Sequence, residues 1–258
     1  MSDEVDGGSE WLAELPRLVA ECVEQWSLEL GEPVDTGHSF VAPAGDSFLK
    51  VNFPDDESEH EAEALARWNG AGAARLVAWD HTRRALLVER LRPGTQLWEV
   101  PDDTATEIAA GVLEQLWIPA GPPFRRLEDE AARWADELVN RPYERRLIDV
   151  AVEFLRAAGP TQRESILLHQ DLHGGNVLLS QRGWLAIDAK PLVGDREFDV
   201  ASLIRDRRPA TKRQMERRLS YLVDRLGLDA ERTRGWAIAH ALAWNGSPEM
   251  IECARLLS

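Results

Sequence analysis

Residues 166–199 hold a dense set of polar side chains between short apolar runs. The apolar runs, which have the length of buried strands, are 166–168, 177–179 and 184–187. Asp171 follows the first run, Asn176 precedes the second and Asp188 ends the third. Because Mg²⁺ prefers carboxylate and amide oxygens, we predict that Asn176 and Asp188 bind metal. Asp171 would then accept a proton from an attacking hydroxyl. The alternative is a polar loop whose side chains satisfy local backbone groups.

The same loop allows a different metal site. His169, Asp171 and His173 alternate along the chain, a spacing that places three metal ligands on one face of a strand. Zinc held there could activate water, so a zinc hydrolase is an alternative function. This alternative leaves Lys50 and Asn176 without a role, and the magnesium site is therefore favoured.

Lys50 is the second candidate, in a predicted strand between Leu49 and Val51. Because side chains alternate along a strand, Lys50 faces away from its apolar neighbours. If that face lines a cleft, the ammonium can meet nucleotide phosphates, with Glu61 or Glu63 of the next helix as its partner. The alternative is an exposed lysine whose stem covers the sheet.

Two further segments suit a nucleotide. Residues 35–39, which end at Ser39, combine one glycine with small polar residues and could bring backbone N–H groups to phosphate oxygens, although an ordinary turn fits as well. Residues 86–91 could offer backbone groups to a flat heterocycle, or form a simple edge strand.

The elements that must position these residues fall into two regions, so we predict an α+β fold. Residues 1–91 form a small β-rich N-terminal lobe, with a flexible tail at 1–8. Its helices are expected at 9–27 and 60–68, a hairpin at 32–53 and strands at 75–79 and 85–90. Residues 92–258 form a larger, mainly helical lobe. Its helices are expected at 103–117, 127–139, 142–158, 197–206, 210–226 and 229–255. Ligand sites favour such an interface between lobes.

Composition narrows the function further. The net charge of −15 argues against nucleic acid or an anionic membrane as a partner, and it could attract a cationic small molecule or simply maintain solubility. No apolar run approaches the roughly 18 residues that span a bilayer. The two cysteines lie at opposite ends of the chain, so a reducing cytoplasm is expected. We expect a monomer or a weak dimer.

Taken together, these segments resemble the protein-kinase-like small-molecule kinases. The resemblance is closest to the aminoglycoside phosphotransferases, in the streptomycin 6-phosphotransferase and hydroxyurea kinase branch. It covers residues 35–245 and rests on the phrases HEAEAL, LLVERLRPGT, LLHQDLHGGNVLL, WLAIDAKPLVGD and GWAIAHAL. It implies a two-lobed kinase-like fold that transfers the γ-phosphoryl of ATP, with GTP not excluded, to a small hydroxylated and cationic acceptor.

The resemblance also implies roles for individual residues. Asp171 matches the catalytic aspartate, and Asn176 and Asp188 match the two Mg²⁺ ligands. Lys50 matches the lysine that contacts the α- and β-phosphates, and Glu61 matches its ion-pair partner. The residues that match the adenine-binding hinge are Glu89, Arg90 and Leu91.

The catalytic loop has two implied supports and one departure from the family pattern. His169 matches a histidine that supports the loop from beneath, Asp195 resembles a loop-anchoring acid, and Asp199 is expected to brace the following helix. The family usually has glycine where this chain has Gln170. If that position requires positive φ, Gln170 strains the loop by about 1 kcal/mol or more. The acceptor-binding residues are not identified, and a nucleotide-binding pseudokinase is a further alternative.

Overall fold

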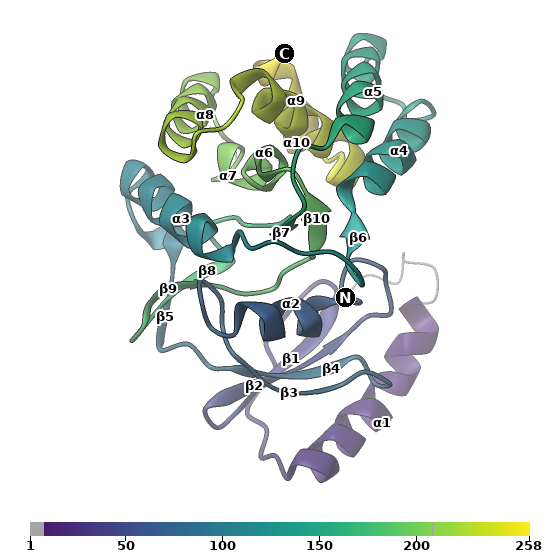
Figure 1. Cartoon of the computed structure of the whole chain (residues 1–258). Coiled ribbons are helices and arrows are strands. Elements are labelled where there is room, and N and C mark those ends of the chain that lie inside the picture. The colour runs from purple at the N-terminus through teal and green to yellow at the C-terminus, as the bar shows by residue number, and fades with distance from the viewer. Residues whose placement is uncertain (1–7, 208) are drawn as a thin grey trace.

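A computed structural model describes residues 8–207 and 209–258, and Figure 1 shows them in a small part and a larger, mainly helical part. The small part contains, in chain order, α1 (Gly8–Trp26), β1 (Ser39–Ala44), β2 (Ser47–Asn52), α2 (Glu61–Trp68), β3 (Leu76–Asp80) and β4 (Ala85–Glu89). The four strands form one antiparallel sheet in the order β1-β2-β4-β3. The predicted flexible tail lies outside the described residues except for Gly8, which begins α1.

The two faces of this sheet contact different parts of the molecule. Leu49 and Val51 of β2 pack into an apolar cluster with α1, in which Cys22 is fully buried. Lys50 lies between them and contacts Glu61 at the start of α2, which confirms the predicted alternation. Burial of one face against α1 thus directs the lysine to the other face.

Two small sheets connect the sheet of the small part to the helices. β5 (Pro93–Gln96) pairs with β8 (Val177–Ser180), which pairs with β9 (Gly183–Ala186). In the other sheet, β10 (Leu192–Gly194) lies between β6 (Arg125–Arg126) and β7 (Ile166–Leu168). The chain leaves the first sheet after Glu89 and joins another at Pro93, and we retain residue 91 as the proposed end of the N-terminal lobe.

The larger part is built mainly from helices (Figure 1). The apolar core of these helices continues into α2 and β4 of the small part. The longer helices of the larger part are α3 (Asp102–Leu116), α4 (Leu127–Leu138), α5 (Arg145–Ala158), α8 (Lys212–Leu226), α9 (Ala230–His240) and α10 (Pro248–Leu257). Its short turns are 3₁₀ helices η1 (Leu97–Glu99) and η2 (Gly159–Thr161), helices α6 (Arg196–Asp199) and α7 (Ala201–Ile204), and π-helix η3 (Ala241–Asn245). An antiparallel sheet followed by a mainly helical part confirms the predicted α+β, two-lobed fold.

Two predicted helices are interrupted. The helix expected at 229–255 is wrong, because Gly246 adopts φ +59° and Ser247 caps a new helix that begins with Pro248. Proline at the first helical position lacks only an N–H that would be unpaired there. The helix expected at 197–206 is also wrong, since α6 ends at Asp199 and α7 begins at Ala201. The strands β5, β6 and β10 were not predicted.

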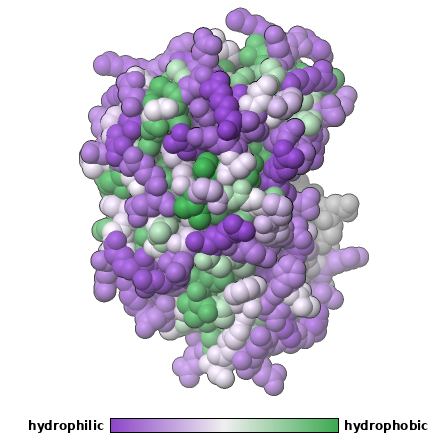
Figure 2. Space-filling model, in the orientation of Figure 1, coloured by the Kyte–Doolittle hydropathy of each residue, from purple (hydrophilic) through white to green (hydrophobic). Residues whose placement is uncertain are grey.

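The face of the molecule in Figure 2 is mostly hydrophilic, with apolar residues gathered in patches. Exposed large apolar side chains include Val77 and Trp79 of β3, at 58% and 52% exposure. Across the described parts of the chain, every helix is too short or too polar to cross a bilayer. Both cysteines are buried, and they form no disulfide with each other, as expected from their separation.

Candidate active site

Lys50 lies at the centre of a buried ion cluster that joins three segments of the chain. Its Nζ donates to both carboxylate oxygens of Glu61, at 2.8 and 2.7 Å, and to Oδ1 of Asp188 at 2.5 Å. The Glu61 side chain is 2% exposed. The expected Lys50–Glu61 pair is therefore present, while the carboxylate of Glu63 lies 3.7 Å from His60.

Mutual attraction keeps this cluster ionised despite its burial. Burial alone would lower the pKa of Lys50, but the carboxylates of Asp188 and Glu61 outweigh burial and raise it. Burial would likewise raise the pKa of Asp188, but the ammonium groups of Lys50 and Lys190 hold it below its ordinary range. A cation fixed beside a carboxylate suits a site for polyphosphate and metal.

The loop between β7 and β8 positions Asp171 by backbone hydrogen bonds. The Asp171 N–H donates to His169 O at 2.9 Å, and the His173 N–H donates to Asp171 O at 3.0 Å. Asn176 Nδ2 donates to the same Asp171 carbonyl at 3.0 Å. His173 Nδ1 accepts from Gly175 N–H at 3.0 Å, and its Nε2 lies 3.7 Å from Asp171 Oδ2.

The Asp171 carboxyl has the electrostatic environment of a general base. Burial, followed by the negative charge of Asp188, raises its pKa to about 7. A carboxyl with a pKa near neutrality can both accept and release a proton at physiological pH. Its loop is held by the β7 and β8 strands on either side, so the group is presented rigidly.

Asn176 and Asp188 offer the oxygen donors that Mg²⁺ would need. Val177 of β8 pairs with Ala186 of β9, and the Ile187 N–H donates to Asn176 O at 2.9 Å. This pairing places Asn176 and Asp188 at the same end of the hairpin. Because Asn176 Nδ2 donates to the Asp171 carbonyl, Asn176 Oδ1 is left as a possible ligand. A magnesium ion usually keeps water and phosphate ligands, so one oxygen from Asn176 and one from Asp188 would be enough protein ligands.

The geometry does not support the zinc alternative. His169 Nε2 donates to Ile187 O at 2.9 Å, and His173 Nδ1 is occupied by a backbone N–H. Burial lowers the pKa of His169 to about 4, so its ring is neutral and acts as a fixed support. In residues 8–207 and 209–258, no three or more His, Cys, Asp or Glu side chains are arranged to hold a metal ion.

The acid that anchors the catalytic loop is Asp199, which corrects the assignment to Asp195. Asp199 Oδ1 accepts from the N–H groups of His169 and Gln170, at 2.9 and 2.8 Å. Its Oδ2 accepts from Trp117 Nε1 at 2.9 Å. Burial raises the pKa of Asp199 to about 6, against the lowering effect of these donors.

Asp195 instead holds the segment that leads into β7. One of its oxygens accepts from the N–H groups of Arg163 and Glu164, at 2.6 and 2.9 Å, and the other pairs with Arg232 of α9. Its effect on the catalytic loop is therefore indirect. Asp195 and Asp199 are four positions apart in the sequence, and only their tertiary contacts show which of them anchors the loop.

Gln170 occupies the strained conformation that the sequence comparison raised as a possibility. Its φ is +69°, in the left-handed region. The residue is fully buried, and neither its side-chain nitrogen nor its oxygen has a hydrogen-bond partner within the described residues. Strain of this kind persists where the surrounding structure over-determines it, which here is achieved by Asp199.

The remaining predicted nucleotide residues lie in the sheet of the small part and in the segment after it, with Ser39 and Glu89 at opposite ends of the strands. Ser39 begins β1 and follows a turn from Val34, whose backbone pairs with Val41. Glu89 ends β4, and its carboxylate accepts from Arg182 at 2.5 Å. The following residues, Arg90 and Leu91, lead toward β5. Their contacts with a nucleotide stay predictions.

Three residues near the loop were missed as site residues. Trp98 stacks on His173, with ring centroids 5.1 Å apart, and its Nε1 donates to Asp206 at 2.7 Å. Asp206 also accepts from Gly174 N–H at 3.0 Å, so these two residues hold the loop from outside. Lys190 lies 3.7 Å from Asp188. The rarity of lysine in the chain was the available signal for Lys190, whereas Trp98 has no local signal.

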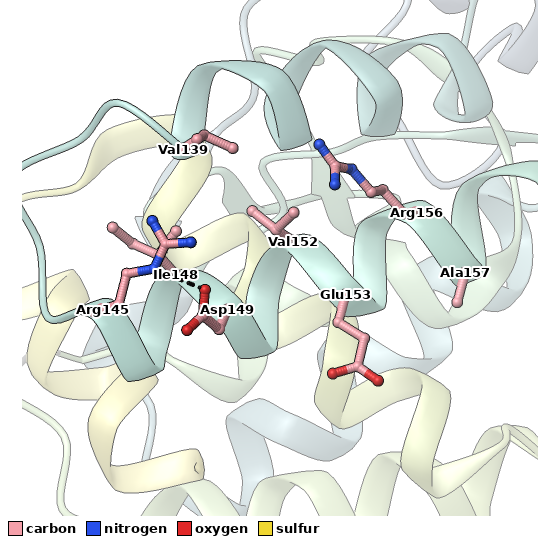
Figure 3. Close-up of a pocket in the computed structure, with 8 residues that line it drawn as sticks. All are labelled: Val139, Arg145, Ile148, Asp149, Val152, Glu153, Arg156 and Ala157. Carbon is pink, nitrogen blue, oxygen red and sulfur yellow. Dashed lines mark ion pairs between the residues drawn. The ribbon is translucent and has the colours of Figure 1, made fainter.

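A surface pocket of about 630 Å³ lies elsewhere, along α4 and α5 (Figure 3). Its lining residues are Val139, Arg145, Ile148, Asp149, Val152, Glu153, Arg156 and Ala157. Arg145 and Asp149 pair with each other at 2.9 Å. None of the catalytic-loop residues lines it, so this pocket is separate from the candidate site.

Known proteins are similar in sequence to this chain over most of its length. The chain is 36% identical to streptomycin 6-kinase of Streptomyces griseus, with 91% of this chain and 83% of that protein covered. It is 35% identical to hydroxyurea phosphotransferase of Kitasatospora aureofaciens, with 91% and 73% covered.

Solved structures share the fold at low sequence identity. Choline kinase LicA from Streptococcus pneumoniae superposes with a TM-score of 0.68 at 13% identity, covering 95% of this chain and 99% of that one. Aminoglycoside phosphotransferase APH(4)-Ia, in a ternary complex with ADP and hygromycin B, gives a TM-score of 0.64 at 14% identity, covering 92% and 97%. The family profile described as aminoglycoside/hydroxyurea antibiotic resistance kinase matches residues 27–246. The chain therefore belongs to the aminoglycoside/hydroxyurea antibiotic resistance kinase family.

Proposed function

We propose that this chain is an ATP-dependent O-phosphotransferase that inactivates a cationic, streptomycin-like aminoglycoside. The observation that carries the proposal is the convergence of Lys50, Glu61 and Asp188, which are up to 138 positions apart, beside a loop that presents Asp171. A buried lysine, a metal-binding acid and a base are the parts that phosphoryl transfer needs.

The reaction follows from these positions. Asp171 takes the proton of the acceptor hydroxyl as its oxygen bonds to the γ-phosphorus, and the bond from that phosphorus to the bridging oxygen breaks to release ADP. Lys50 holds the α- and β-phosphates, and Glu61 keeps its ammonium in place. Asn176 and Asp188 would hold Mg²⁺, which supplies positive charge to the phosphate oxygens when bound.

The negative charge of the chain favours streptomycin over hydroxyurea as the acceptor. Sequence identity does not decide between them, because the streptomycin kinase and the hydroxyurea phosphotransferase have nearly the same identity to this chain. The net charge of −15 raises the local concentration of a polycation, whereas it offers nothing to a neutral molecule. The two buried cysteines form no disulfide with each other, which suits a reducing cytoplasm.

The test is a nucleoside-diphosphate release assay with ATP or GTP against a panel of acceptors. The panel contains streptomycin, other aminoglycosides, hydroxyurea and a buffer blank, and the Asp171→Asn variant is the matched control. ADP release that requires streptomycin and Asp171 supports the proposal. Release with hydroxyurea alone would reassign the acceptor, and tight nucleotide binding without release would favour a pseudokinase.

A further inference from the structure

The chain has only three lysines, at positions 50, 190 and 212, and the second lies beside the transfer site. The backbone N–H of Lys190 donates to His169 O at 3.0 Å, which fixes it against the start of the catalytic loop. Its Nζ lies 3.7 Å from Asp188 Oδ1. Its charge also acts on the Asp171 carboxylate, where it opposes the raised pKa. Lys190 is thus close to the proposed metal ligand, and its charge reaches the proposed base.

Most of the Lys190 side chain is buried, whereas its ammonium reaches the surface of the site and makes no hydrogen bond within the described residues. Its side chain is 12% exposed, and the contact with Asp188 is too long for a hydrogen bond. Within the part of the chain that the structure describes, its Nζ donates no hydrogen bond. Lys50 differs, because its ammonium donates to Glu61 and Asp188. An ammonium whose donors are open in this way can donate them to an anion bound beside Asp188.

We propose that Lys190 is a further catalytic residue, which binds the transferring γ-phosphoryl group through its open ammonium donors. This inference rests on the proposed function. The acceptor oxygen reaches the phosphorus from the side of Asp171, and the diphosphate leaves on the side of Asp188. An ammonium that lies beside Asp188 and whose charge reaches Asp171 would therefore meet the equatorial phosphoryl oxygens. Negative charge on those oxygens is stabilised by a preorganised cation at no cost of reorganisation.

A purely structural role makes a different prediction. The carboxylate of Glu57 accepts from Trp244 Nε1 at 2.5 Å. Burial raises the pKa of Glu57, and the positive charge of Lys190 acts to lower it. If Lys190 only neutralised this group of acids, its loss would alter stability and all nucleotide binding together. If it binds the γ-phosphoryl, its loss affects the triphosphate and leaves the diphosphate unchanged.

The experiment compares Lys190→Met with Lys212→Met, which makes the same chemical change at an exposed position at the start of α8. Calorimetric titrations with ADP and with the triphosphate analogue AMP-PNP, in Mg²⁺, are followed by acceptor-independent ATP hydrolysis and acceptor phosphorylation. For Lys190→Met we expect AMP-PNP affinity to fall about tenfold, ADP affinity to change less than about twofold, and kcat to fall about 100-fold, the effect of losing one preorganised donor. Lys190→Arg should recover part of kcat, and Lys212→Met should match the wild type.

Equal loss of ADP and AMP-PNP affinity, or wild-type kcat in Lys190→Met, would overturn the assignment. The triphosphate-to-diphosphate affinity ratio needs no acceptor, so it separates this inference from the acceptor identity. Failure to phosphorylate any aminoglycoside, with the ratio lowered only in Lys190→Met, would refute the proposed acceptor and support the role of Lys190. A wild-type protein that binds neither nucleotide would overturn both.

Discussion

Replacing Gln170 by glycine should stabilise the protein, because two features of Gln170 raise the free energy of the folded state. Its φ of +69° costs a non-glycine residue about 1–2 kcal/mol. Its buried amide leaves two polar atoms unpaired within the described residues, and one such group costs about 1–3 kcal/mol. Glycine removes both costs.

Two opposing terms reduce the gain. Glycine loses about 0.5–1 kcal/mol more backbone entropy on folding, and each buried methylene removed from the Gln170 side chain forfeits about 0.8 kcal/mol. The balance is a stabilisation of about 1 kcal/mol, which for a chain of this size raises Tm by about 2–4 °C.

The assay is thermal and urea denaturation of wild type, Gln170→Gly and Gln170→Ala. Alanine removes the amide but keeps the positive φ. Relative to alanine, glycine relieves about 1–2 kcal/mol of strain, loses about 0.5–1 kcal/mol of backbone entropy and forfeits about 0.8 kcal/mol for one buried carbon, so the two variants should be about equally stable. An alanine variant more stable than the glycine variant by about 1.5 kcal/mol would refute the argument from backbone strain. A glycine variant less stable than the wild type would refute the balance of terms.

Three further outcomes follow from the site. Asp171→Asn should abolish transfer while nucleotide affinity, measured by calorimetry, stays within about threefold; full turnover would remove Asp171 from the mechanism. Because burial and Asp188 raise the pKa of Asp171 to about 7, the folded state binds this proton more tightly than the unfolded state, so its ionisation lowers stability as pH rises from about 4 to about 7. The stability of Asp171→Asn relative to wild type, measured without metal, should therefore increase from about pH 5 to about pH 8, and a constant difference would contradict the shift. Lys50→Met should lower the free energy of unfolding by about 3–5 kcal/mol, because it leaves Glu61 buried without a cation; urea midpoints unchanged from wild type would exclude the buried pair as a stabilising contact.

Local sequence pattern was enough to predict where several of the candidate site residues lie. Strand alternation directed Lys50 away from Leu49 and Val51, and the structure places it against Glu61. Short apolar runs placed Asn176 and Asp188 at strand ends, because such runs are readable without knowledge of the tertiary fold.

Residues whose roles depend on contacts across the fold could not be assigned in the same way. Asp195 and Asp199 lie in one short segment, and only the approach of the catalytic loop to Asp199 shows which of them anchors it. Trp98 stacks on His173 from η1, about 75 residues earlier in the chain. η1 directly follows β5, a strand that forms despite a proline and a glycine. The break at Gly246 did have a local signal, since Ser247 and Pro248 are a capping residue and a first-turn proline.

The most direct test of the central claim is the mass of streptomycin after incubation with this protein, ATP and Mg²⁺. The proposed mechanism predicts that the drug gains one phosphoryl group for each ADP formed, with wild type and Lys212→Met, and that Asp171→Asn forms no product. Unmodified streptomycin at complete nucleotide saturation, or phosphorylated drug formed by Asp171→Asn at the wild-type rate, would contradict it.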